Sequence, residues 1–186
     1  MKKTVLVALA DGFEEIEAVT PIDILRRAGL EVLVAGVGKQ ELTGSNGIRI
    51  RADIELEKYA GPLPDAIVLP GGAQGASNLA ASQAVSALLG RMRDQGRLVA
   101  AICAAPAVVL AKSGLLEGKT ATCYPGYEKN FGPGITFSPE RVVTDGRVIT
   151  SRGPGSAMEF ALEIVRDLVD SATAERLTRA LVARPS

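Results

Sequence analysis

The stretch from residue 98 to residue 106 reads Leu98-Val99-Ala100-Ala101-Ile102-Cys103-Ala104-Ala105-Pro106. Five apolar residues run directly into a cysteine, and a second apolar pattern of helical character follows at residues 107–111. A buried parallel strand that ends in a turn and opens a helix has this composition. We therefore predict that Cys103 lies at the corner between a strand and a helix, with backbone N–H groups directed toward its side chain.

The predicted corner has the geometry of a nucleophile elbow, in which small residues two positions before and after the nucleophile let backbones approach closely. Ala101 and Ala105 occupy those two positions. A structural interpretation stands beside this one, because free cysteine is among the most buried residue types and often acts as a small hydrophobe. This stretch alone supports a nucleophilic and a structural Cys103 about equally.

The composition bounds the class of protein. At 186 residues the chain is of a length typical of one domain, which we expect to span residues 1–186. Hydrophobic residues make up 47% and aromatic residues 4%, so the predicted core is aliphatic. The 21 basic and 21 acidic residues balance, and we expect no nucleic-acid partner, since phosphate-backbone binding needs a concentrated basic face.

The sequence contains no histidine. The chain itself therefore cannot form a Ser-His-Asp or Cys-His hydrolytic centre or a His-ligated zinc site. Chemistry must rest on cysteine, carboxylates, tyrosine and backbone donors, and we expect no metal and no cofactor. The two cysteines, Cys103 and Cys123, are too few for a disulfide framework.

The apolar run at the N-terminus is followed by Asp11 and several glutamates, where a signal peptide would have its cleavage region. We therefore interpret this run as a buried first strand. No apolar run approaches the ~20 residues of a membrane span. These features predict a cytoplasmic protein with no membrane partner.

Strand-like and helix-like segments alternate along the chain. Strands are predicted at residues 3–10, 30–37, 48–52, 66–69, 98–102 and 120–122, and Asp145-Gly146 predicts a hairpin between two further strands. Helices are predicted at residues 82–95, 158–169 and 171–183, and another begins with Thr20 as its N-cap and Pro21 at its first position. This alternation predicts an α/β sandwich with a mostly parallel central sheet.

Ligands bind beyond the carboxyl ends of the strands in such folds. Residues 11–17, residues 70–75 and Cys103 all follow strands, so we expect them to converge there. Gly71-Gly72 is either a simple tight turn or, beside Cys103, a source of N–H groups that hold an oxyanion together with the N–H of Ala104.

Glutamates at positions 14, 15 and 17 follow the first strand. A helix dipole favours acidic residues in the first turn, and this explains Glu14 and Glu15 as solvated side chains. Glu17 is flanked by apolar residues, and a carboxyl in an apolar site beside a thiolate has a raised pKa. We predict that Glu17 donates a proton to the sulfur or acts as a general acid–base, while a helix N-terminus lowers the pKa of Cys103.

Four motifs, which occur in order along nearly the whole chain, resemble those of the ThiJ/PfpI superfamily. They are Ala10-Asp11-Gly12-Phe13-Glu14-Glu15-Ile16-Glu17, Leu69-Pro70-Gly71-Gly72, residues 100–106, and Ser151-Arg152-Gly153-Pro154-Gly155. Within the superfamily the chain is most similar to the branch of the parkinsonism-associated deglycase and its bacterial relatives. The four motifs together favour a functional Cys103 over a structural one.

The resemblance implies a flavodoxin-like three-layer sandwich and a homodimer with the site near the subunit interface. Family members are described as glyoxalases without a cofactor, as deglycases, and as oxidative-stress proteins whose cysteine forms sulfinic acid. The site residues that the matching motifs imply are Cys103 as the reactive cysteine, Glu17 as the protonated carboxyl, Gly71, Gly72 and Ala104 around the oxyanion, and Pro154 and a partner-donated Arg26 nearby.

Cys123-Tyr124-Pro125 departs from the family pattern, because many relatives have histidine before this proline. Protease activity in the superfamily needs such a histidine, or one next to the elbow cysteine, so a chain without histidine disfavours it. Tyr124 can donate a hydrogen bond to a substrate, but a reference pKa near ~10 makes it a poor base at neutral pH.

Two functions follow from these features. The first is a glyoxalase III-like lyase or a deglycase acting on small α-oxoaldehydes such as methylglyoxal, or on their adducts. The second is an oxidative-stress sensor in which Cys103 is oxidised to sulfinic acid without metabolic turnover. We favour the enzyme. A disulfide switch between Cys103 and Cys123 is weaker, because nothing in the sequence places them within ~7 Å.

Overall fold

Seven strands form one sheet in the computed structural model, which describes residues 2–183. Their spatial order is β10-β11-β7-β6-β1-β2-β5, and neighbouring strands are parallel except for β10 and β11. The strands are β1 (Thr4–Leu9), β2 (Glu31–Gly36), β5 (Ile54–Glu55), β6 (Ala66–Leu69), β7 (Leu98–Ile102), β10 (Val142–Asp145) and β11 (Val148–Ser151). The prediction of an α/β fold with a mostly parallel sheet is confirmed. Residues 1 and 184–186 of the predicted domain lie outside the described residues.

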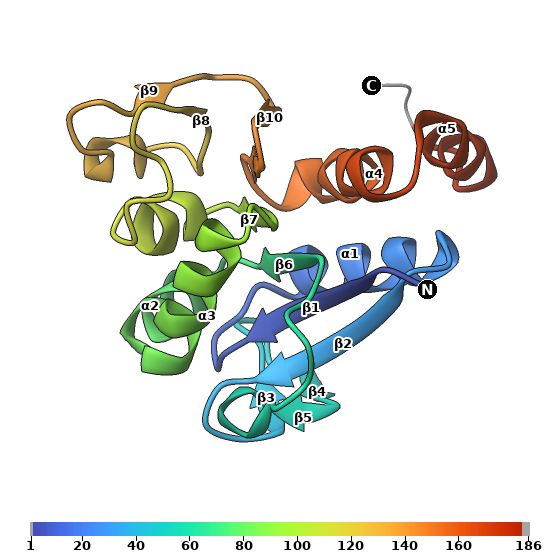
Figure 1. The fold of residues 1–186 in the computed structure, drawn as a ribbon, viewed down its shortest axis with the longest axis horizontal. Coiled ribbons are helices and arrows are strands. Elements are labelled where there is room, and N and C mark those ends of the chain that lie inside the picture. Colours follow the sequence, from blue (N-terminus) through green and yellow to red (C-terminus); the bar gives the residue numbers. More distant parts are fainter. Residues whose placement is uncertain (1, 184–186) are drawn as a thin grey trace.

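Helices cover both faces of the sheet (Figure 1). On one face α1 (Glu15–Arg27) packs beside α4 (Ala157–Leu168), and α5 (Ser171–Ala180) packs against α4. On the other face lie α2 (Ala73–Ala81), α3 (Gln83–Asp94) and the π-helical segment η2 (Pro106–Leu110). Buried side chains from these layers form one contiguous aliphatic core.

The position of β7 in the sheet explains why residues 98–102 are all apolar. It lies between β6 and β11, and each of its five residues is at most 1% exposed. A parallel strand covered by helices on both faces has no polar side to present, so a continuous run of aliphatic residues forms it. The strand ends at Ile102, which places Cys103 at the carboxyl edge of the sheet.

The start of α1 differs from the prediction. The helix begins at Glu15, and the carboxylate of Glu14 caps it by accepting the backbone N–H of Glu17 at 2.8 Å. Pro21 therefore lies inside the helix rather than at its first position, and Thr20 is not the N-cap. A proline in a helix interior removes one backbone hydrogen bond. The acidic cap and the burial of residues on both sides of Pro21 outweigh that loss.

Several short elements were not predicted. α2 contains a single large apolar residue, Leu79, so it carries no clear helical period. β3 (Glu41–Thr43) and β9 (Thr136–Phe137) were also not predicted. They pair with β4 (Arg49–Arg51) and β8 (Thr120–Ala121), which lie within the strands predicted at residues 48–52 and 120–122. Single 3-10 turns are formed by η1 (Leu56–Lys58), η3 (Glu128–Asn130) and η4 (Pro154–Ser156). Within residues 2–183, no helix is both long enough and apolar enough to cross a membrane.

Candidate active site

Three strand ends bring the predicted site residues together. Glu17 lies in the first turn of α1, shortly after β1, whereas Gly71 and Gly72 follow β6 and Cys103 follows β7. Because β1, β6 and β7 are consecutive parallel neighbours, their carboxyl ends meet at one edge of the sheet. The backbone N–H of Gly71 donates to Glu17 Oε2 at 2.8 Å, which joins two of the three segments directly.

Cys103 occupies a sharp corner. Its φ of 67° lies in the left-handed region, which costs a residue with a side chain on the order of 1 kcal/mol or more. Two hydrogen bonds hold this backbone: the Cys103 N–H donates to the Ser151 carbonyl at 2.9 Å, and the Cys103 carbonyl accepts the Tyr124 N–H at 2.8 Å. Cys103 is 8% exposed, so the residue is largely shielded from solvent. This geometry is that of the predicted nucleophile elbow.

Gly71 lies between the Cys103 thiol and the Glu17 carboxyl, in close contact with both. A Cβ built on Gly71 would lie 2.6 Å from both Cys103 Cβ and Glu17 Oε2. No side chain fits between them, so glycine at this position is what lets the thiol and the carboxyl approach each other. Gly72 has a φ of +85°, and a Cβ there would lie 2.3 Å from the Gly12 carbonyl oxygen.

Glu17 is fully buried. Its Oε2 atom accepts the Gly71 N–H, whereas Oε1 meets no nitrogen or oxygen donor among residues 2–183. Burial, reinforced by the charge of Glu14, raises the pKa of Glu17 to about 7, although hydrogen bonds from Cys103 and from the Gly71 N–H favour the charged form. Glu17 therefore exchanges its proton near neutral pH.

The expected lowering of the Cys103 pKa is wrong. Burial and the neighbouring charge of Glu17 raise the pKa of the thiol to about 12, against the opposite effect of the Gly72 and Ala104 N–H groups that point toward the sulfur. These two backbone donors favour the thiolate, but a thiolate at this depth also loses its hydration and faces a carboxylate.

The two shifts are linked, because each group responds to the charge of the other. The negative charge that raises the Cys103 pKa is absent while Glu17 holds its proton. A protonated carboxyl can also donate a hydrogen bond to the sulfur. The site therefore stabilises one negative charge on the pair and opposes two.

Two glutamates that the sequence suggested were solvated have structural roles. Glu15 is only 5% exposed, and its carboxylate accepts bonds from the Asn46 side chain, the Ser45 hydroxyl and the backbone N–H groups of Asn46 and Ile48. It fastens the β3–β4 turn to the start of α1. Glu14 caps α1, and its charge contributes to the raised pKa of Glu17. The turn lies 30 positions downstream of Glu15, so no local signal marks that contact.

Tyr124 and Pro154 line a cavity of about 370 Å³ together with Pro125, Pro139, Arg141, Arg152, Gly153, Gly155 and Ser156. The Cys103 backbone is hydrogen-bonded to the backbones of Ser151 and Tyr124, so the chain segments that carry this cavity are joined to the elbow. Cys103 is not among the residues that line the cavity. Cys123, next to Tyr124, is a free thiol that is fully buried, and burial raises its pKa to about 12.

Arg26 is not brought to the thiol of its own chain. Its guanidinium donates to the Val32 carbonyl at 3.2 Å and lies 3.6 Å from Asp53. Arg26 lies nine positions after Glu17 in α1, a rise of about 13 Å along the helix axis. Any role for Arg26 at a reactive cysteine would require a second subunit.

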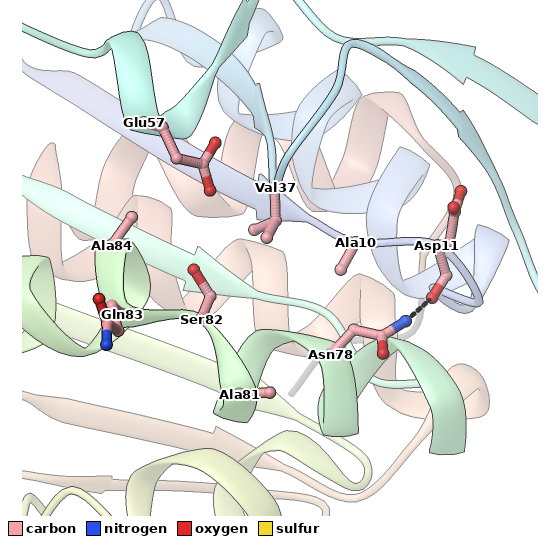
Figure 2. A pocket seen from close by; sticks show the side chains of 9 residues that line it. All are labelled: Ala10, Asp11, Val37, Glu57, Asn78, Ala81, Ser82, Gln83 and Ala84. Carbon is pink, nitrogen blue, oxygen red and sulfur yellow. Dashed lines mark hydrogen bonds between the residues drawn. The ribbon is translucent and has the colours of Figure 1, made fainter.

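A larger cavity, of about 470 Å³, lies elsewhere beyond the end of β1 (Figure 2). Asp11, Glu57, Asn78, Ser82 and Gln83 are its polar lining residues, and the Asn78 amide donates to the Asp11 carbonyl oxygen at 2.9 Å. It contains no thiol and none of the residues around Cys103. In the part of the chain that the structure describes, no cluster of three or more Cys, Asp and Glu side chains could hold a metal ion.

Comparison with known proteins places this site in a family. The model of the DJ-1/PfpI family matches residues 3–167. The chain is 43% identical over 187 residues to the Parkinson disease protein 7 homolog of Danio rerio, and the match covers 98% of each chain. It is 38% identical over 168 residues to the glutathione-independent glyoxalase DJR-1.2 of Caenorhabditis elegans, covering 90% of this chain and 89% of that protein.

The fold agrees with these matches. The structure of oxidized DJ-1 from Toxoplasma gondii is 40% identical and superposes with a TM-score of 0.95, covering 98% of this chain and 100% of that one. Some relatives are longer, since the chain spans 42% and 47% of the lengths of the DJ-1 homologs B and A of Arabidopsis thaliana.

Proposed function

This chain belongs to the DJ-1/PfpI family, and we propose that it is a glyoxalase or deglycase without a cofactor. Its substrates in this proposal are small α-oxoaldehydes such as methylglyoxal, or their adducts. One observation carries the proposal: a buried carboxyl with a pKa near 7 interacts with a thiol that also receives two backbone N–H groups. This arrangement supplies a nucleophile, a proton shuttle and oxyanion donors in a chain without histidine.

The first step forms a hemithioacetal. The Cys103 sulfur bonds to the aldehyde carbon of methylglyoxal, and the thiol proton passes through Glu17 to the new oxygen. The N–H groups of Gly72 and Ala104 stabilise the negative charge that develops on that oxygen. Because these donors belong to the backbone, they need no reorganisation during the reaction.

The second step moves a proton between neighbouring carbons. Glu17 as carboxylate removes the proton from the former aldehyde carbon and returns it to the adjacent carbonyl carbon. The hydroxyl proton of the hemithioacetal passes to the neighbouring oxygen, and the product is a thioester of a hydroxy acid. Water then hydrolyses the thioester, releasing lactate and restoring the thiol. A general acid–base is most effective when its pKa lies near the working pH, as that of Glu17 does. The C. elegans relative named as a glutathione-independent glyoxalase supports this assignment.

We predict that the purified protein converts methylglyoxal to lactate without added thiol, as measured by an enzymatic lactate assay. Cys103→Ser removes the nucleophile and should lower the rate at least about 1,000-fold. Glu17→Gln removes the proton shuttle and should lower it about 100-fold or more. Cys123→Ser is the matched control, because it removes the other buried thiol and should keep at least half of the activity. Equal rates for wild type and Cys103→Ser would refute the mechanism.

A second function, cysteine oxidation in a stress response, draws on the same contacts. A sulfinate on Cys103 would carry its negative charge where the Gly72 and Ala104 N–H groups already point, and a protonated Glu17 could donate to it. The structural relative from T. gondii is described as oxidized. The raised pKa of Cys103 argues for slow oxidation, since peroxide reacts with the thiolate.

Mild peroxide should add two oxygen atoms to Cys103, and intact-mass and peptide mass spectrometry measure this directly. Glu17→Gln should raise the rate of that oxidation, because it removes the charge that opposes the Cys103 thiolate. Cys123 provides the internal comparison and should stay unmodified under the same treatment. Equal oxidation of the two cysteines would exclude a dedicated sensor.

We also propose a homodimer, formed through α1 and the β3–β4 turn. Ile16 and Val19 lie three positions apart on α1 and are 53% and 47% exposed, and Ile48 in the turn is 56% exposed. The backbone N–H of Ile48 donates to Glu15 at 3.4 Å, so the turn that carries Ile48 is joined to the start of α1. Exposed apolar clusters of this kind mark interaction sites. A second copy on this surface would lie next to the helix that carries Glu17.

Ile16→Lys should convert the dimer to a monomer, measured as a mass falling from about twice 19.3 kDa to 19.3 kDa by light scattering on a sizing column. Val169→Lys is the control, because Val169 is also exposed (39%) but lies at the end of α4. A monomeric wild type, or the same dissociation with Val169→Lys, would contradict the proposed interface.

A further inference from the structure

We propose that the cavity beyond the end of β1 is a binding site for a small organic cation that carries hydroxyl groups, such as an amino polyol. The site is separate from the reactive thiol, and the inference goes beyond the proposed function. It rests on one unpaired carboxylate and on the unused hydrogen-bonding groups that share its cavity.

The cavity lies at the edge of the sheet where ligands bind in folds of this class. Ala10 and Val37 directly follow β1 and β2, which are parallel neighbours, and most of the other lining residues come from η1, α2 and the start of α3. Its volume of about 470 Å³ falls within the range of about 300–1,000 Å³ that is typical of small-molecule sites. Both the position and the size of the cavity therefore suit a small ligand.

Glu57 gives the cavity its charge. Its Oε2 atom accepts the backbone N–H of Gly38 at 3.0 Å, whereas its Oε1 atom has no hydrogen-bond partner among residues 2–183. The adjacent Lys58 pairs with Glu55 instead, at 2.9 Å. The Glu57 carboxylate thus keeps an acceptor and its full negative charge for a ligand.

No basic side chain lines the cavity in the part of the chain that the structure describes. Asp11, the second acidic lining residue, pairs with Lys39 at 2.5 Å and accepts the backbone N–H of Thr43 at 3.0 Å. The unpaired charge of the cavity is therefore that of Glu57. An ammonium group complements it, because hydrogen bonds between charged partners are the stronger ones.

Uncharged groups in the same cavity suit hydroxyls. Figure 2 shows the Ser82 hydroxyl and the Glu57 carboxylate directed toward the same space, where η1 packs against α3. Ser82 Oγ accepts the backbone N–H of Val85 at 3.3 Å and keeps its own proton for a ligand. The Gln83 side-chain amide makes no hydrogen bond among residues 2–183, so it can both donate and accept. Hydroxyl groups, which also do both, match this set.

The turn after β1 separates the cavity from the reactive site. The Asn78 amide donates to the Asp11 carbonyl oxygen within the cavity, at 2.9 Å. The next residue, Gly12, faces the oxyanion loop, since a Cβ on Gly72 would lie 2.3 Å from its carbonyl oxygen. Cys103 does not line the cavity, so a ligand bound there needs no contact with the thiol.

A matched pair of ligands tests the site. Glucamine and sorbitol share one polyol chain, but glucamine carries an ammonium group where sorbitol has a terminal hydroxyl. Neither contains a carbonyl, so neither can form a hemithioacetal with Cys103. In titrations followed by backbone amide NMR, wild type should bind glucamine about tenfold more tightly than sorbitol, the effect of one charge-assisted hydrogen bond. The shifted amides should be those of Asp11 and residues 82–84.

Glu57→Gln should lower the affinity for glucamine about tenfold, to that for sorbitol, and leave the affinity for sorbitol within about twofold of wild type. The glutamine amide oxygen can still accept the Gly38 N–H, so the local fold is kept. Glu140→Gln is the matched control, because it removes the same charge from an exposed residue outside the cavity. It should leave both affinities unchanged.

Cys103→Ser separates this inference from the proposed function, because it should abolish methylglyoxal turnover and still bind glucamine as wild type does. Loss of glucamine binding in Cys103→Ser would place the ligand at the reactive site and overturn the inference. Equal affinities of wild type for the two polyols, no shifts at the lining residues, or an equal loss in Glu140→Gln would also overturn it. Absence of methylglyoxal turnover in wild type would refute the proposed function alone.

Discussion

Two neighbouring buried groups, the Glu17 carboxyl and the Cys103 thiol, can carry one negative charge between them but not two, and the rest of the site is arranged around that constraint. Placing two negative charges at this depth is strongly unfavourable, since neither would be hydrated and each would repel the other. Burial therefore holds the pKa of Glu17 near 7 and moves that of Cys103 to about 12. The pair accommodates a single charge, which backbone N–H groups of Gly71, Gly72 and Ala104 stabilise.

The fold maintains this contact at some cost elsewhere. Cys103 adopts a left-handed backbone conformation, and α1 retains a proline inside the helix. Gly71 leaves no room for a side chain between the two groups. These local penalties are tolerated because β1, β6 and β7 are buried parallel neighbours that hold the three segments in place. The positions of Glu17 and Cys103 therefore depend on three strand ends at one edge of the sheet, and no single sequence motif determines them.

The parts of the fold and of the site that could be predicted are those that a local sequence pattern marks. The apolar runs at β1, β6 and β7 and the Asp145-Gly146 hairpin identified the sheet, and the flanking apolar residues singled out Glu17. Contacts between distant segments escaped prediction: the bonds from the β3–β4 turn to Glu15, and the cavity between Tyr124 and Arg152, have no sequence period. The direction of the Cys103 pKa was missed for a related reason, because helix-start donors are visible in sequence whereas burial depth is not.

Titration of the Cys103 thiolate by ultraviolet absorbance, in wild type and in Glu17→Gln, tests the single-charge constraint most directly. The same titration of Cys103→Ser is subtracted to remove the signals of Cys123 and the tyrosines. In wild type the thiolate should reach full ionisation only at high pH, since ionised Glu17 opposes it. In Glu17→Gln that charge is absent, so the Cys103 thiol should ionise at a lower pH than in wild type. Superimposable curves for the two proteins would contradict the coupling of Glu17 to Cys103.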